Sequence, residues 1–245
     1  MVLLVDIGNT ASKFASLERG KFSYLGRLYN FDISEEKISS LLGKLEVKEI
    51  YVSSVAPKIL FSLENIFLNL YHLSTNKIDA SYNDFITLNI DNKDELGPDL
   101  LCDIVAGANI YKSRVAIIDF GTATKVLFID KNGIFNSCAI FPGYKKSKEI
   151  LANTTELLPE VKQVPVKKIS ECHNTIDVIN SSTYYSQIDS INGIISRYEN
   201  EVGYKLNRVY TGGNALPFIN DLIKKEEYDE FLLLKGMALL IERRN

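Results

Sequence analysis

Two stretches of the chain carry the same kinds of residue in the same order. Asp6-Ile7-Gly8-Asn9-Thr10 follows one apolar run, and Asp119-Phe120-Gly121-Thr122-Ala123-Thr124 follows another. Glycine lets a backbone approach a ligand closely, and turn N–H groups with Thr or Asn side chains form a concave anion site. A carboxylate beside a phosphate needs a cation between them, so the motif predicts phosphate binding with Mg²⁺ or a monovalent ion. Either copy alone would favour an ordinary turn in which Asp caps its own backbone; two equivalent copies favour the phosphate site.

The two motifs belong to a longer internal repeat. Aligning Val2 with Val115 also aligns Gly8 with Gly121, Gly20 with Gly133 and Phe22 with Phe135. Each copy is an apolar strand, Asp-x-Gly, a polar turn, a second strand, a glycine turn and a third strand. The repeat predicts an N-terminal domain over residues 1–112 and a C-terminal domain over 113–245, with a cleft between them.

Two further features point to an anionic ligand. Lys13 follows the first loop and is placed to neutralise phosphate charge. Thr211-Gly212-Gly213-Asn214-Ala215 predicts a strand, a glycine turn and a helix start, which suits anions and flat ligands but is equally typical of a plain strand-to-helix turn. The sequence has no G-x-x-x-x-G-K-[ST] motif, so a P-loop is excluded.

Alternating strand-like and helix-like patterns position these motifs. Strands are expected at Val2–Val5, Lys13–Glu18, Phe22–Tyr29, Glu49–Val55, Val115–Asp119, Thr124–Asp130, Ile134–Phe141 and Arg208–Thr211. Helices are expected at Ser34–Gly43, Pro57–Leu70, Pro98–Tyr111, Lys145–Asn153, Thr175–Asn200, Ala215–Lys224 and Gly236–Arg243. The pattern is that of an α/β protein.

Composition narrows the class of protein. The 245 residues are 46% hydrophobic and 24% charged, with a net charge of −3 and no basic stripe, so no nucleic-acid partner is expected. The apolar run at the N-terminus stops at Asp6, which predicts neither a signal peptide nor a membrane span, and a cytoplasmic location follows. Cys102, Cys138 and Cys172 lack metal-site spacing and are expected to be reduced, mostly buried thiols.

The order of the motifs resembles one family over nearly the whole chain. With Gly97-Pro98-Asp99, Ala139-Ile140-Phe141-Pro142-Gly143 and Thr155–Pro159, the motifs above are similar to those of type III pantothenate kinase, also described as Bvg accessory factor-like. The resemblance implies two similar actin-like (ribonuclease H-like) domains with mixed sheets around a central cleft. It also implies a homodimer that phosphorylates pantothenate with ATP to 4′-phosphopantothenate, the first step of coenzyme A synthesis.

The resemblance assigns a role to each motif. Asp99 would be the general base, although on its own it reads as an ordinary first-turn helix residue. Asp6 would hold Mg²⁺ through water, and Asp119 would hold a monovalent cation, K⁺ or NH₄⁺. The ATP and phosphate contacts would come from Asp6, Ile7, Gly8, Asn9, Thr10, Ala11, Ser12, Lys13, Gly121, Thr122, Thr124, Gly212, Gly213 and Asn214. Pantothenate would be held by Gly97, Pro98, Asp99, Leu100 and, from the partner subunit of the dimer, Thr175.

The chain departs from the family pattern mainly on the acceptor side. Leu100 stands where the family has Arg, Ile90 where it has Tyr, and Lys125-Val126-Leu127 where it usually has Thr-x-Asp. Losing a charged donor costs about 1.5–3 kcal/mol of binding. The alternatives are a weak kinase, a changed acceptor, a regulatory homologue that only binds nucleotide, and a hydrolase or sugar kinase of the same superfamily. Lys125 and Lys145 are candidates to replace the missing Arg.

Overall fold

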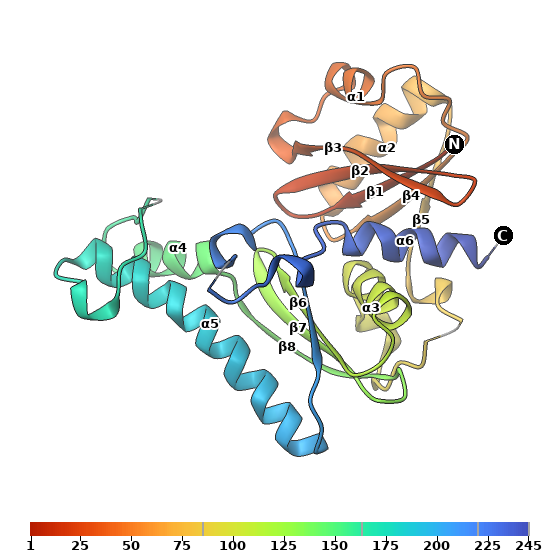
Figure 1. Ribbon diagram of the computed structural model, residues 1–245. Helices are drawn as coiled ribbons and strands as arrows, with labels where there is room; N and C mark the ends of the chain where they lie inside the picture. Colours follow the sequence, from red (N-terminus) through yellow and green to blue (C-terminus); the bar gives the residue numbers. More distant parts are fainter. Residues whose placement is uncertain (85, 163, 220, 245) are drawn as a thin grey trace. The chain divides into compact units, whose positions relative to one another are not determined.

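A computed structural model describes residues 1–84, 86–162, 164–219 and 221–244 (Figure 1). The chain falls into two compact units. The first unit comprises Met1–Ser113, Ile129–Asn136 and Phe231–Asn245, and the second comprises Arg114–Phe128 and Ser137–Glu230. The first change of unit, at Ser113, lies beside the predicted boundary, but the end of the chain belongs with the first unit. The domains at 1–112 and 113–245, which include four residues outside the described ranges, stay a prediction.

The first unit is built on a five-stranded mixed sheet in the order β3-β2-β1-β4-β5. Its strands are β1 (Val2–Ile7), β2 (Ala11–Glu18), β3 (Lys21–Tyr29), β4 (Glu49–Ser54) and β5 (Thr75–Lys77). The β1–β2–β3 strands form an antiparallel meander, whereas β4 and β5 extend the sheet in parallel on the other side of β1. The short β5 was not predicted from the sequence.

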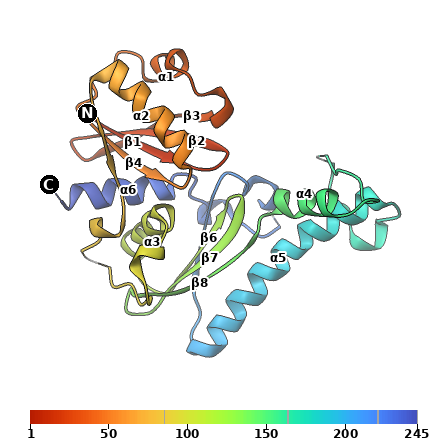
Figure 2. The ribbon, with the colours of Figure 1, turned by 180° about the vertical axis from the view of Figure 1, so that it is seen from behind.

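Helices cover both faces of this sheet. Helices α1 (Glu35–Leu42) and α2 (Pro57–Tyr71) cover one face, and α3 (Pro98–Ile110) and α6 (Leu232–Glu242) cover the other (Figures 1 and 2). Alternate β1 residues Leu3, Val5 and Ile7 belong to the core that α1 and α2 close. On the other face, α3 and α6 approach so closely that a side chain on Gly236 would overlap the backbone of Cys102.

The second unit repeats the same sheet plan. The order is β8-β7-β6-β9, with β6 (Val115–Phe120), β7 (Ala123–Ile129), β8 (Phe135–Pro142) and β9 (Asn207–Thr211). As β1 pairs in parallel with β4, so β6 pairs in parallel with β9. The glycine turns predicted after the second strand also match, since both Gly20 and Gly133 adopt positive φ, at 75° and 79°.

Helix α5 (Thr175–Val202) and α4 (Tyr144–Thr154) complete the second unit. Asn174 caps the start of α5 by accepting from the Asp177 N–H, and Gly203 ends it at a φ of 76°. Aromatic side chains fill the core: Phe128 stacks on Tyr198 at 4.1 Å, and Tyr184 stacks on Phe218 at 5.0 Å between ring centres. The long helix therefore packs its buried side chains into the core of its own unit.

One predicted helix is wrong. Over the described part of Ala215–Lys224, the structure has only a 3₁₀ turn at Leu216–Phe218 and a further turn, and Pro217 in this segment has no N–H to donate. The final helix begins at Leu232, four residues before the predicted start at Gly236. The 3₁₀ helices are Asn30–Asp32, Ala80–Tyr82, Lys93–Glu95, Ile169–Glu171, Leu216–Phe218 and Lys225–Glu227.

Candidate active site

The first loop joins β1 to β2 directly after Asp6. Asp6 lies opposite Lys13 in the antiparallel pair, so a carboxylate and an ammonium flank the loop on neighbouring strands. The loop closes through a bond from the Gly8 N–H to the Ala11 carbonyl at 3.1 Å. Asn9 and Thr10 at its tip are exposed. The arrangement leaves backbone and polar side chains of the tip open to an anion.

Asn30, which the sequence did not single out, holds this loop in place. Its side-chain amide donates to the Gly8 carbonyl at 2.8 Å, and its backbone N–H donates to the Thr10 carbonyl at 3.0 Å. Its side-chain oxygen accepts from the Ser12 hydroxyl at 3.1 Å. Asn30 follows the third strand, so no local pattern around the loop could have revealed it.

Two of the predicted phosphate-loop residues have fully buried side chains. Ile7 belongs to the hydrophobic core, and the Ser12 hydroxyl is directed at Asn30. The side chains of these two residues therefore position the loop.

The start of α3 carries the predicted general base. Gly97 caps the helix, Pro98 is its first residue, and Asp99 lies in its first turn, where the helix dipole favours a carboxylate. A side chain on Gly97 would meet Asp99 Oδ1 at 2.6 Å, so the carboxylate folds back over the glycine. Gly97, Pro98, Asp99 and Leu100 are all partly exposed.

Cys102 is a fully buried thiol of α3 whose pKa is affected by several carboxylates. Burial raises its pKa well above the ordinary value, and the negative charges of Asp103, Asp6 and Asp99 raise it further, while the Ser53 hydroxyl lowers it in part. Asp6 lies opposite Ser53 in the pairing of β1 with β4, and α3 packs against β4. The end of β1 and the first turn of α3 therefore bring Asp6 and Asp99 to the same region of the first unit.

The second loop, between β6 and β7, follows the same plan with other partners. The Gly121 N–H bonds to the Ala123 carbonyl at 3.1 Å, which makes this loop one residue shorter than the first. Asn214 donates from its side chain to the Gly121 carbonyl at 2.9 Å and from its backbone to the Phe120 carbonyl at 2.9 Å. Thr122 at the tip is exposed. The predicted residue Asn214 is thus positioned to hold the loop.

Thr124 is fully buried and uses its hydroxyl within the protein. It donates to the Gln187 side-chain oxygen at 2.8 Å, and the Gln187 amide donates to the Pro142 carbonyl at 2.8 Å. Gln187 lies on α5, far from the loop in sequence, and no sequence signal pointed to it. Thr124 ties the second loop to this helix.

Asp119 forms an ion pair with Lys125. The ammonium lies 2.9 Å from Asp119 Oδ2, and the two side chains are only 16% (Lys125) and 13% (Asp119) exposed. The residues around Asp119 therefore do not fit the monovalent cation that the resemblance implied, because a lysine ammonium occupies that side of the carboxylate. Whether Lys125 or the exposed Lys145 replaces the missing Arg near Asp99 stays a prediction.

The predicted glycine turn after β9 packs against the carboxylate of this ion pair. Gly212 has a φ of 96°, and a side chain there would overlap Asp119 Oδ1 and the backbone of Phe120. Gly213, by contrast, is exposed and has open space around it. Only glycine fits at position 212. Steric exclusion therefore explains the first glycine of the Gly-Gly sequence but not the second.

The remaining predictions concern Thr175 and metal ions. Thr175 is exposed at the first position of α5. Within the described ranges, no three His, Cys, Asp or Glu side chains form a group that could hold a metal. Asp6 and Asp99 nevertheless supply the kind of oxygen that Mg²⁺ takes in nucleotide sites, where water and phosphate complete its shell.

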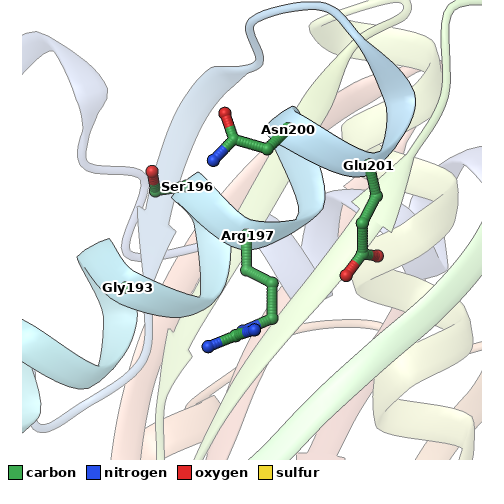
Figure 3. A pocket seen from close by; sticks show the side chains of 5 residues that line it. All are labelled: Gly193, Ser196, Arg197, Asn200 and Glu201. Atoms are coloured by element: carbon green, nitrogen blue, oxygen red, sulfur yellow. The ribbon is translucent and has the colours of Figure 1, made fainter.

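A hollow on the second unit lies away from the second loop. A space of about 510 Å³ is lined by Gly193, Ser196, Arg197, Asn200 and Glu201 of α5 (Figure 3). This end of α5 leads into the start of β9, where Asn207 pairs with Val115, whereas Asp119 pairs with Thr211 at the other end of the sheet. The hollow is therefore separate from the second loop.

None of the helices in the described ranges has the length and apolar character that a membrane span needs.

Comparisons with known proteins identify relatives over the whole length. A sequence model of the family described as type III pantothenate kinase matches residues 2–197. A protein of that name from Bacillus cytotoxicus is 27% identical over 99% of this chain and 96% of its own length. Another from a Sulfurihydrogenibium species is 28% identical over 98% of this chain and 99% of its own.

Solved structures agree with the fold. A putative Baf family transcriptional activator from Campylobacter jejuni superposes with a TM-score of 0.56 at 21% identity, over 99% of this chain and 98% of that one. The Acidaminococcus fermentans (R)-2-hydroxyglutaryl-CoA dehydratase component A gives 0.52 at 17% identity, over 97% and 94%. Ta0583, an archaeal actin homologue, gives 0.52 at 11% identity, over 99% of both chains. These likenesses, with the two matching sheets, confirm the predicted actin-like α/β fold.

Proposed function

This chain belongs to the type III pantothenate kinase family, and we propose that it phosphorylates pantothenate with ATP to give 4′-phosphopantothenate, the first step of coenzyme A synthesis. It is a kinase, as the family model over residues 2–197 and both full-length relatives indicate. The observation on the molecule that carries the proposal is that Asp6, opposite Ser53 of β4, and Asp99, in the first turn of the helix that packs against β4, belong to the same region of the first unit. A phosphate-loop carboxylate and a helix-start carboxylate in one region are what metal-assisted transfer to an alcohol needs.

Asp99 is the proposed general base. The primary hydroxyl oxygen of pantothenate attacks the γ-phosphorus, the bond from that phosphorus to the β–γ bridging oxygen breaks, and the hydroxyl proton passes to the Asp99 carboxylate. Phosphoryl transfer depends mainly on positioning and on stabilising charge. The position of the partly exposed Asp99 carboxylate over Gly97, at the start of α3, supports this role because a substrate hydroxyl can reach it.

The loops are the proposed phosphate contacts. Asn9, Thr10 and Thr122 lie exposed at the two tips, and Lys13 lies opposite Asp6. Bound Mg²⁺ would neutralise charge on the phosphates, and Asp6 would hold it through water. Gly213, next to the closely packed Gly212, offers an exposed backbone for the nucleoside.

On the acceptor side, the residue expected to bind the carboxylate of pantothenate departs from the family pattern. Leu100 cannot donate to a carboxylate, so the pantothenate KM should be high. If Leu100→Arg restores the donor, the pantothenate KM should fall about ten- to a hundred-fold with kcat little changed. An unchanged KM would argue for a different acceptor.

The dimer and the cytoplasmic location are also proposals from the family. The exposed position of Thr175 at the start of α5 is compatible with a contact across a dimer. Light scattering gives the mass directly: twice 27.6 kDa is expected, and a monomer that retains full activity would remove Thr175 from the site.

A regulatory, non-catalytic homologue is not favoured. Its structural support is the Campylobacter jejuni protein named as a putative transcriptional activator, which at 21% identity shows only a shared fold. The two named kinases, by contrast, match over the whole chain.

The proposal is tested by incubating the protein with ATP, Mg²⁺, K⁺ and pantothenate and measuring phosphopantothenate by mass spectrometry. Asp99→Asn should lower kcat by about 10²- to 10⁴-fold. Asp94→Asn, an exposed acidic residue in the turn just before α3, is the matched control and should leave kcat unchanged. ATP binding without product would favour the regulatory homologue, and ATP hydrolysis without pantothenate would favour a hydrolase.

A further inference from the structure

The ion pair between Asp119 and Lys125 is the least exposed of the ion pairs found in the described ranges when both partners are considered. Asp119 lies near the end of β6, and Lys125 lies in β7 just beyond the two-residue loop. The ammonium and the carboxylate are 2.9 Å apart, which is a charge-assisted hydrogen bond. The pair thus sits directly beneath the second phosphate loop.

Backbone groups enclose the carboxylate on its other sides. Gly212 leaves no room for a side chain beside Oδ1, and a side chain on Gly121 would lie 3.7 Å from Oδ2. The carbonyls of the two residues that follow Asp119, Phe120 and Gly121, each accept a hydrogen bond from Asn214. One lone pair of each of these carbonyls is thus used by Asn214, and the Oδ2 atom of Asp119 is used by Lys125.

A carboxylate this buried needs a positive charge beside it, because removing one partner of such a pair leaves an uncompensated charge. The lysine ammonium is a compact point charge with three donors, a tethered counterpart of a free ammonium ion. A second cation placed against Asp119 would lie next to this ammonium and be repelled by it. We propose that Lys125 is a built-in counter-cation for Asp119, so that nucleotide binding and phosphoryl transfer in this chain need no added K⁺ or NH₄⁺.

Lys125 has an equivalent residue beside the first loop. Because the second loop is one residue shorter, Ala123 takes the place of Ala11, and Lys125 therefore takes the place of Lys13. Lys13 lies opposite Asp6 in the same manner. Each loop thus carries one Asp and one Lys on neighbouring strands, and at 125 this lysine stands where the family usually has Thr.

The inference rests on the proposed function, but its first readout does not. Binding of a non-hydrolysable ATP analogue with Mg²⁺ is measured by calorimetry in K⁺ and in a choline buffer free of K⁺ and NH₄⁺. The wild-type protein should bind with the same Kd in both. Lys125→Met, which removes the charge but keeps the length of the chain, should bind at least ten-fold more weakly in choline and recover in K⁺ or NH₄⁺.

Thermal unfolding and catalysis give the second and third readouts. K⁺ should raise the Tm of Lys125→Met by several degrees and leave that of the wild type unchanged, and phosphopantothenate formation should follow the same pattern. Lys146→Met is the matched control, because Lys146 forms an ion pair of the same 2.9 Å length with Glu149 on the exposed surface of α4. It should show no cation dependence in any readout.

Two results would overturn the proposal. One is wild-type nucleotide binding that weakens ten-fold or more when K⁺ is removed. The other is a folded Lys125→Met that K⁺ and NH₄⁺ fail to restore, which would make Lys125 a direct phosphate ligand. If Lys125→Met does not fold, the wild-type comparison alone decides, with Lys125→Arg as the second variant, which should remain independent of K⁺. Absence of phosphopantothenate with intact, cation-independent nucleotide binding would reject the proposed function and leave this inference standing.

Discussion

The two phosphate loops share a plan but differ in how far along the chain their supports lie. In the first loop, the amide that holds Gly8 comes from Asn30, 22 residues away, and Ser12 bonds to the same Asn30, 18 residues away. In the second, Gly121 is held by Asn214, 93 residues away, and Thr124 bonds to Gln187, 63 residues away. The first loop is complete once its three-stranded meander has formed, whereas the second also needs β9 and α5. A duplicated motif therefore keeps its local shape while its supports are drawn from different elements.

The largest difference in the free energy of unfolding is expected between two substitutions in the turn that packs on Asp119. Gly212→Ala should lower the free energy of unfolding by about 3 kcal/mol or more, because the φ of 96° and the contact with the Phe120 backbone exclude a side chain. Gly213→Ala, with open space around it, should change it by less than about 0.5 kcal/mol. Urea unfolding measures both. Equal effects would mean that the close packing of Gly212 on Asp119 is wrong.

Removing the side-chain amides that hold the loops should give the next largest losses of stability. Asn30→Ala should cost about 2 kcal/mol, since it removes the donor to Gly8 and leaves the buried Ser12 hydroxyl without its partner. Asn214→Ala should cost about 1 kcal/mol, because the backbone bond from residue 214 to Phe120 remains. Both should raise the KM for ATP. A larger loss of stability for Asn214→Ala would reverse the comparison.

For the buried hydroxyls the order should be reversed, with the larger loss of stability in the second loop. Thr124→Val should cost about 1.5 kcal/mol, because the buried Gln187 oxygen loses its donor. Ser12→Ala should cost about 0.5–1 kcal/mol, since Asn30 is partly exposed and water can replace the hydroxyl. Unfolding of the double variant should equal the sum of the single losses, because the two sites share no partner. A non-additive result would reveal coupling between the loops.

The smallest expected signal is the labelling of Cys102. Burial and the nearby carboxylates raise its thiol pKa, so the reactive thiolate is scarce at and below the ordinary pKa and forms only at higher pH. Iodoacetamide at pH 8 should leave Cys102 unlabelled in the folded protein, while the exposed Cys138 of the second unit reacts. Mass spectrometry of tryptic peptides measures this. Rapid labelling of Cys102 would mean that this thiol is not buried in the folded protein.

Much of the fold followed from local chemistry. The two Asp-x-Gly turns, the proline-led start of α3 before Asp99 and the glycine turns at Gly20 and Gly133 depend on neighbouring residues, which the sequence displays directly. The strand and glycine turn before Ala215 predict a helix start there, but Pro217 and the contacts of Phe218 with the aromatic core favour a tight turn.

The amino-acid sequence by itself determined the repeated strands, the loop residues and the resemblance that led to the family, because turn chemistry and hydrophobic period act over a few residues. Only the tertiary structure decided that Asn30, Gln187 and Asn214 support the loops, and that Lys125 is the counter-ion of Asp119. A buried polar or charged group takes whichever partner the fold brings within hydrogen-bond distance, and across 63 or 93 residues that choice belongs to the packing of strands and helices.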